Sequence, residues 1–205
     1  VTNGEIFSMV SLPDFNPNHP SKIRAYTENN LVTNARFEMG STLKMFNAAM
    51  AIENNSVDKN DLFDVSKDYK LTNTYLVKDH KKLEKPINFN EIFIESSNIG
   101  SIKVLEKTGV EKQKDFFYSL GFNEKVILKG LSSIENNLPN HSEWNDVRSK
   151  SISYGYGISI TPLSLVKIFS SLVNGGYIVN PSITFSGKPN KERVLKKETS
   201  DKINN

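Results

Sequence analysis

The sequence predicts a mixed α/β (α+β) fold from two kinds of local pattern. Residues 4–12 are largely apolar, have the length of a strand and end at Pro13, so they predict a buried strand. Later segments are bounded by residues typical of helix ends, such as Thr161 at a helix start and Gly109 after a helix end. The chain of 205 residues is long enough for one domain with a hydrophobic core.

Residues 38–53 are the most informative stretch. After Gly40 they are apolar on nearly all sides, which predicts a buried helix. Ser41, Lys44 and Asn47 interrupt this pattern at a spacing of three residues and therefore share one side of the helix. A buried lysine with a pKa lowered from about 10.4 towards about 7–8 can act as a base, and a serine needs a base to become a nucleophile. N–H groups at a helix start also favour an oxyanion near Ser41.

A structural interpretation of the same helix is that its lysine extends to the surface while its serine caps the first turn. The S-x-x-K pattern is weak by itself, because Ser56/Lys59 in a polar loop and Ser164/Lys167 inside a helix repeat it. Only the Ser41 copy combines a helix start with apolar surroundings. The helix alone leaves the catalytic and the structural interpretations open.

Capping patterns predict the other elements in order. A capping box of Asn88 and Glu91 begins a helix that ends at Glu95. Further helices are expected at residues 99–107, 111–120 and 162–173. A short strand is expected at Ile23–Glu28 and a strand start at 177–185. We expect no long element at residues 54–88 and a loop-rich stretch at residues 122–150. Residues 186–205 are expected to form a polar, mobile tail.

Ser96-Ser97-Asn98 lies between two of these predicted helices and is the only S-x-N triplet in the chain. Such short polar residues can simply cap helices. In the functional interpretation they form a second wall of the site around Ser41. The Ser96 hydroxyl then relays a proton between Lys44 and a leaving amine, and the Asn98 amide holds Lys44 and binds a substrate amide.

Four stretches together resemble a known family, in the order in which it carries them. They are GEIFSMVSLPDFNPN, FEMGSTLK, ESSNIG and SYGYGISITPLSLVKIFSSLVNGG. They are similar to the transpeptidase domain of class B penicillin-binding proteins, and most similar to its septal, FtsI-type members. The resemblance covers almost all of residues 4–185. It implies the fold shared with serine β-lactamases, an antiparallel sheet with flanking helices, with a mostly helical subdomain at about residues 55–150.

The resemblance implies a peptidoglycan D,D-transpeptidase that acts through an acyl-enzyme on Ser41 and is acylated by penicillin. Lys44 matches the family's base, and Ser96 and Asn98 match its S-x-N pair, with Asn98 on the substrate. The backbone N–H of Ser41 matches an oxyanion donor. Implied partners are peptidoglycan stem peptides, β-lactam antibiotics, a glycosyltransferase and divisome proteins. Met39 stands where septal enzymes usually carry proline.

The family also requires a K-T-G triplet on an edge strand. The triplet at Lys107-Thr108-Gly109 does not qualify, because it follows S-x-N too closely and ends a predicted helix. We therefore expect residues 1–205 to be the N-terminal and middle part of one transpeptidase domain, without its C-terminal strands and incomplete in activity. The family further implies a location on the periplasmic face of the bacterial inner membrane, with an anchor upstream of this chain.

Composition narrows the remaining classes. The chain has no cysteine, and its three histidines are dispersed, so no metal site or cofactor is expected. Its net charge of +3 comes from scattered basic residues, which does not favour nucleic acid as a partner. Two alternatives stay open. One is a β-lactamase-like serine hydrolase, for which no acidic residue can be assigned to activate water. The other is a non-catalytic, penicillin-binding fragment.

Overall fold

The computed structural model describes residues 3–24, 29–184, 187 and 189–205. Its helices are α1 (Leu31–Asn34), α2 (Lys44–Glu53), α3 (Phe89–Ile94), α4 (Asn98–Thr108), α5 (Val110–Ser119), α6 (Asp146–Ser153), α7 (Pro162–Val173) and α8 (Lys197–Asn204), with 3-10 turns η1 (Pro20–Lys22), η2 (Gly40–Leu43) and η3 (His141–Glu143). Among the described residues, no helix is long and apolar enough to cross a membrane.

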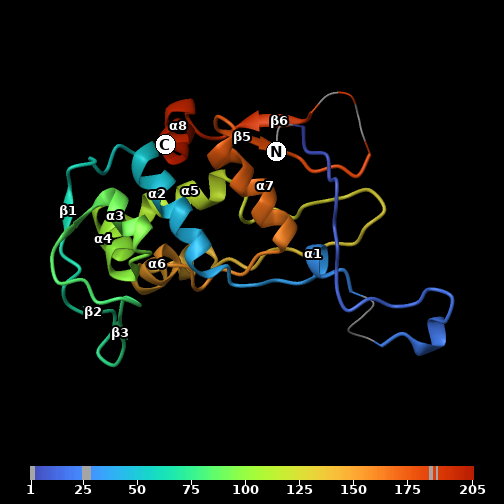
Figure 1. Cartoon of the computed structure of the whole chain (residues 1–205), viewed down its shortest axis with the longest axis horizontal. Coiled ribbons are helices and arrows are strands. Elements are labelled where there is room, and N and C mark those ends of the chain that lie inside the picture. The colour runs from blue at the N-terminus through green and yellow to red at the C-terminus, as the bar shows by residue number, and fades with distance from the viewer. Residues whose placement is uncertain (1–2, 25–28, 185–186, 188) are drawn as a thin grey trace.

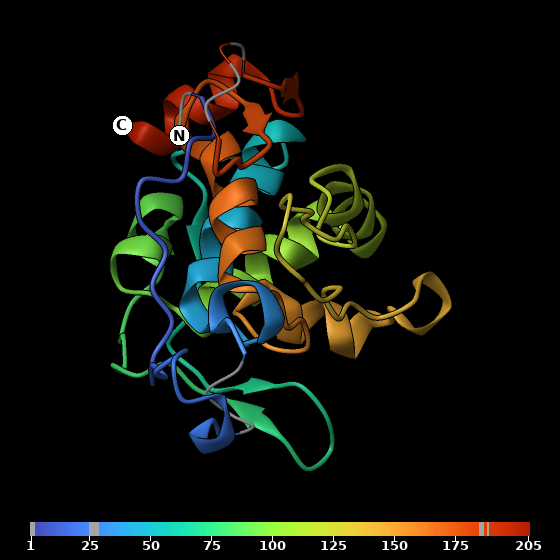
Figure 2. The ribbon, with the colours of Figure 1, turned by 90° about the vertical axis from the view of Figure 1, so that its right-hand side faces the viewer.

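The strands of the described residues are short and form two-stranded antiparallel sheets. The pairs are β1 (Leu62–Phe63) with β4 (Ile87–Asn88), β2 (Tyr69–Lys70) with β3 (Leu76–Val77), and β5 (Tyr177–Val179) with β6 (Lys191–Arg193). The β2–β3 hairpin projects away from the helices (Figure 2). This hairpin leads into the segment that borders the candidate site.

Helix α2 lies in the middle of the molecule, with α3 and α4 on one side and α7 on the other (Figure 1). Leu43, Phe46 and Met50 are completely buried in the largest apolar cluster. The Phe46 ring packs edge-on against Phe122 and Phe169, with centroid distances of 5.0 and 5.8 Å. The prediction of a buried helix after Gly40 is therefore confirmed.

The opposite side of α2 carries small residues, which let neighbouring helices come close. Ala48 and Ala51 pack in a second apolar cluster with Ile92 of α3 and Ile99 of α4. Because both sides of α2 face apolar neighbours, its few polar side chains lie at helix–helix seams. This position brings Lys44 to the N-terminal end of α4.

The capping patterns place most helices correctly. The Asn88–Glu91 box is present, with Glu91 N donating to Asn88 Oδ1 at 3.0 Å and Asn88 N donating to Glu91 Oε2 at 2.7 Å. Thr161 caps α7, and Gly109 follows α4 with a φ of 103°. Helix α6 was not predicted, because its residues lie in and beside a stretch expected to be loop-rich.

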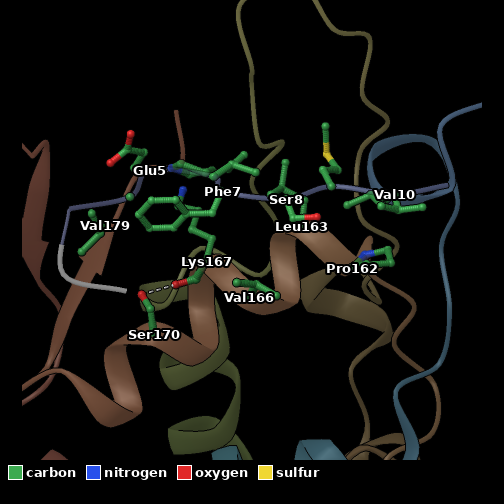
Figure 3. A pocket seen from close by; sticks show the side chains of 15 residues that line it. Glu5, Phe7, Ser8, Val10, Pro162, Leu163, Val166, Lys167, Ser170 and Val179 are labelled. Atoms are coloured by element: carbon green, nitrogen blue, oxygen red, sulfur yellow. Dashed lines mark hydrogen bonds between the residues drawn. The ribbon is translucent and has the colours of Figure 1, made fainter. Parts of the chain in front are cut away.

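The expected strand at residues 4–12 is wrong. This segment makes only one bridge, from Glu5 to Ser182, and Phe7 is 90% exposed. The apolar pattern is real, but most of the segment has no strand beside it among the described residues and so forms no ladder. It runs across α7 and encloses an apolar pocket there (Figure 3). The strand expected at Ile23–Glu28 falls largely outside the described residues.

The expectation of a polar, mobile tail after residue 185 is also wrong for its described part. Strand β6 pairs with β5, and α8 packs on α2 and α7. Leu195 is 2% exposed, and the buried Ser200 hydroxyl donates to Leu172 O at 2.8 Å. The Thr199 hydroxyl donates to Glu53 in the same way. Hydropathy misses this helix because small polar residues are buried when their hydroxyls find acceptors.

The central position of α2 generates a stability prediction. We expect Phe46→Ala to lower the free energy of unfolding by about 3–5 kcal/mol, because it removes a completely buried ring. The matched control, Ile94→Ala, removes a side chain that is 79% exposed and is expected to change stability by less than about 0.5 kcal/mol. Urea unfolding followed by circular dichroism measures both. Equal effects of the two substitutions would contradict this packing.

Candidate active site

Ser41 is an exposed residue in the 3-10 turn η2, which directly precedes α2. The turn is held by the glycine-rich stretch that follows α6. Glu38 Oε1 accepts a hydrogen bond from Gly157 N at 2.8 Å. Gly155 has a φ of +116°, and a Cβ added there would lie 2.1 Å from Gly40 O. Only glycine allows this close backbone approach, so the glycine pattern fixes the turn that carries Ser41.

Lys44 is only 3% exposed, which excludes a side chain extended into solvent. Its Nζ donates to Ser96 Oγ at 3.0 Å and also to the Ser96 carbonyl oxygen. In the part of the chain that the structure describes, the backbone N–H of Lys44 donates to Ser41 O, but no hydrogen bond joins the Ser41 hydroxyl to the Lys44 amine, although both residues line one pocket. Catalytic hydrogen bonds often form only when substrate is bound, so this spacing is compatible with proton transfer.

The Lys44 amine has an unusual protonation equilibrium. Burial lowers the pKa of Lys44 from 10.5 to about 8, although the negative charge of Asp79 acts to raise it. With a pKa of about 8, about a quarter of the amines are neutral at pH 7.5, against about 0.1% for an ordinary lysine. Burial thus provides a usable base near physiological pH.

The Ser96–Asn98 corner joins α3 to α4. Ser96 has a φ of +51°, which is uncommon for a residue other than glycine and is found at sites held by their surroundings. Ser97 is the N-cap of α4 and accepts from Gly100 N at 2.8 Å. Asn98 Nδ2 donates to Lys78 O at 2.9 Å. Among the described residues no hydrogen bond joins Asn98 to Lys44, and Ser96 holds the lysine instead.

These residues share a pocket with a volume of about 350 Å³. Its walls are formed by Gly40, Ser41, Lys44, His80, Glu95, Ser96, Asn98, Tyr154 and Tyr156. A second hollow, beside the β2–β3 hairpin, shares Asn98 and both tyrosines with the first. The two tyrosine rings lie 5.6 Å apart. The structure therefore brings Ser41, Lys44, Ser96 and Asn98 together in one cleft.

The apolar pocket beside α7 is larger, about 420 Å³, but its polar groups do not form a reactive set (Figure 3). Its Ser170 hydroxyl donates to Lys167 O at 2.6 Å. Lys167, the lysine of another S-x-x-K copy, is paired with Glu124 at 3.2 Å. The Lys167 amine is thus occupied by a carboxylate and is not held by a serine as Lys44 is, so the chemistry favours the smaller pocket.

Sequence reasoning expected no long element at residues 54–88 and missed the place of Asp79 and His80 beside the site. Asp79 accepts hydrogen bonds from Ser97 Oγ at 2.6 Å and from Ile99 N at 3.0 Å. His80 lines the pocket. No motif links residue 79 to residues 97–99, because the contact depends on how the chain returns after β3. Sequence spacing gives no signal for it.

The rejected K-T-G triplet lies where the sequence placed it. Lys107 and Thr108 end α4, and Gly109 follows the helix. The Thr108 hydroxyl donates to Val104 O at 2.9 Å within the helix, and Lys107 pairs with Asp61. None of the three residues lines the Ser41 pocket. The rejection of this triplet as a substrate-binding strand is confirmed.

Comparisons with known proteins agree with this geometry. The chain is 28% identical to a probable peptidoglycan D,D-transpeptidase FtsI of Caulobacter vibrioides, over 98% of this chain and 34% of that protein. It is 24% identical to a probable peptidoglycan D,D-transpeptidase PenA of Neisseria meningitidis, with the same coverage. The chain thus spans about a third of the length of these curated relatives.

Solved structures match at the level of the fold. The transpeptidase domain of penicillin-binding protein 3 from Burkholderia pseudomallei superposes with a TM-score of 0.78 at 21% identity, covering 86% of this chain and 54% of that chain. This likeness confirms the predicted penicillin-binding-protein fold. All of residues 1–205 match the family described as penicillin binding protein transpeptidase domain. The chain belongs to this transpeptidase domain family.

Proposed function

We propose that this chain carries the nucleophile part of a peptidoglycan D,D-transpeptidase, with Ser41 as the residue that is acylated. The observation that carries the proposal is the buried Lys44 amine, which is held by Ser96 in the pocket that Ser41 lines. The names of the relatives support the same reaction. Residues 1–205 then form the N-terminal and middle part of one transpeptidase domain, in line with their coverage of solved chains.

The proposed first step is acyl transfer to the enzyme. Neutral Lys44 takes the proton of the Ser41 hydroxyl, and Ser41 Oγ attacks the carbonyl carbon of the peptide bond between the two D-alanines. The backbone N–H of Ser41 donates to the oxyanion. The Ser96 hydroxyl relays the proton to the leaving amine of the terminal D-alanine. The C–N bond breaks and an ester on Ser41 remains.

The second step passes the acyl group to another stem peptide. An amine of that stem attacks the ester carbonyl carbon and loses a proton, which passes through Lys44 to Ser41 Oγ as the ester C–O bond breaks, and the new peptide bond forms the cross-link. Asn98 and the two tyrosines line the same cleft, which supports a proposed role for them in binding the peptide. A β-lactam carries a strained amide that Ser41 can open, but its leaving amine stays attached and blocks the second step.

The cellular setting is part of the same proposal. A substrate of the cell wall implies the periplasmic face of the inner membrane, and the resemblance of the sequence to septal, FtsI-type members, together with an FtsI relative, implies work at division. A glycosyltransferase that makes the glycan strands and the divisome proteins are the proposed partners.

Replacement of the nucleophile tests the proposal directly. We expect Ser41→Ala to abolish covalent labelling by a fluorescent penicillin, because Ser41 is the proposed acylated residue and the Ser96 hydroxyl, which accepts from Lys44 at 3.0 Å, serves as the proton relay. Ser56→Ala, which alters another S-x-x-K copy in a loop, is the control and should label like the unchanged chain. Gel fluorescence and intact mass measure the adduct. Persistent labelling of the Ser41→Ala chain would refute the assignment, and rapid release of penicilloate by the unchanged chain would favour a hydrolase.

The lysine base predicts a pH dependence. Because only the neutral amine accepts a proton, the acylation rate should rise with pH through a midpoint of about 8, the pKa of Lys44. Lys44→Met should lower the plateau rate by about 10²–10⁴ and remove this midpoint. Lys167→Met, in the S-x-x-K copy of α7, is the matched control. Stopped-flow measurement of penicillin acylation from pH 6 to 10 gives both values, and a flat profile in the unchanged chain would contradict the base role.

A further inference from the structure

Two consecutive residues, Lys78 and Asp79, bind the part of the Ser96–Asn98 corner that begins α4. Asp79 uses both carboxylate oxygens, Oδ2 for the Ser97 hydroxyl at 2.6 Å and Oδ1 for Ile99 N at 3.0 Å. Lys78 O accepts from Asn98 Nδ2 at 2.9 Å. The contacts span 18–20 positions of sequence. They tie the segment after β3 to the start of α4.

The chain of contacts continues to the lysine. Ser97, which Asp79 holds, follows Ser96, whose hydroxyl and carbonyl oxygen accept from Lys44 Nζ. Ser96 has a left-handed backbone with a φ of +51°, a conformation that persists only when neighbouring groups determine it. A carboxylate at the N-terminus of α4 also meets the free N–H groups of that helix end. The half-buried Asp79 thus holds Ser97, and the adjacent Ser96 accepts from Lys44.

We propose that Asp79 is a positioning residue of the acyl-transfer site, which holds the Ser96–Asn98 corner in register with Lys44 and Ser41. The inference rests on the proposed function of these residues and assigns a role to a residue outside the two motifs. Asp79 is not among the residues that line the pocket. It acts through Ser97 and through its charge.

The charge effect has a defined sign. The negative charge of Asp79 raises the pKa of Lys44, against the larger lowering by burial. The other titratable groups around the pocket are Glu95 at the end of α3, His80 next to Asp79, and Tyr154 and Tyr156 after α6. Glu95 is already paired with Lys81 at 3.1 Å. Loss of the Asp79 charge should therefore move the Lys44 titration to lower pH.

Asp79→Asn is the principal test, because asparagine has the same size but no charge and only one acceptor oxygen. We expect its plateau rate of acylation by a fluorescent penicillin to fall at least tenfold and up to about 10²-fold, since small displacements of catalytic groups cost this much. The midpoint of its pH profile should also move to lower pH. Asp68→Asn is the matched control. It removes a carboxylate near the same hairpin that pairs with Lys78 at 3.4 Å, and it should change neither quantity.

Ser97→Ala deletes the same contact from the other side. It should lower the acylation rate at least tenfold alone and have a less than additive effect in the Asp79→Asn background, because both changes break the hydrogen bond between Asp79 and Ser97, while Ser97→Ala also removes the cap on Gly100 N. An Asp79→Asn rate within twofold of the unchanged chain, or a lowered plateau with an unmoved midpoint, would overturn the proposal. If Asp79→Asn does not fold, Ser97→Ala decides alone, with a rate within twofold counting against the role.

A direct titration separates this inference from the proposed function. Lysine labelled with ¹³C at Cε gives the Lys44 midpoint by NMR without any substrate, and the signal is assigned by its loss in Lys44→Met. A lower midpoint in Asp79→Asn supports the charge coupling even if the unchanged chain fails to label with penicillin, which would count against the proposed function alone. Equal midpoints in the two chains would refute the coupling.

Discussion

The arrangement of this molecule depends on one buried amine. Lys44 sits on a helix that is apolar on nearly all sides, and burying an amine is costly unless its donors find acceptors. Ser96 provides two acceptors, and they come from the tight corner between α3 and α4. One turn further along α2, the buried Asn47 donates to Ser101 O at 2.9 Å. The polar stripe of α2 is therefore the seam that holds α2 against the start of α4.

The turn before α2 depends on a different constraint, the absence of side chains. Gly155 lies so close to Gly40 O that any Cβ would overlap it. A hydrogen bond from Gly157 N to Glu38 Oε1 holds the same two segments together. Because Tyr154 and Tyr156 flank this glycine, the loop that fixes the nucleophile turn also places two walls of the cleft. The glycine pattern thus has a geometric reason, whereas in the sequence it only marked a likeness to a family.

Much of the fold could be predicted where local chemistry decides the structure. The capping box at Asn88, the Thr161 cap with the following proline, and the apolar helix after Gly40 each specify their element without distant partners. The expected strand at residues 4–12 failed because a strand depends on its neighbours. Helix α8 was missed because its hydroxyl groups are buried only where α2 and α7 provide acceptors for them.

The same division applies to the site. Ser41, Lys44, Ser96 and Asn98 were found because each lies in a short motif, and the structure gathers them in one cleft. The Asn98 amide was expected to hold Lys44, but it donates to Lys78 O instead. Asp79 has no motif, and its contacts with Ser97 and Ile99 arise only once the chain has folded back after β3. Contacts between single residues that lie far apart in the sequence are the part of the site that could not be predicted from one sequence.

The two acceptors of Ser96 have a consequence for the resting state of the lysine. An ammonium group has three N–H bonds, whereas a neutral amine has two and one lone pair. The two hydrogen bonds to Ser96 use both N–H bonds of the neutral form. Deprotonation therefore leaves no donor stranded in the apolar interior, and the lone pair occupies the one tetrahedral position that Ser96 does not use. The fold thus satisfies both N–H donors of the reactive form of the amine before any substrate arrives.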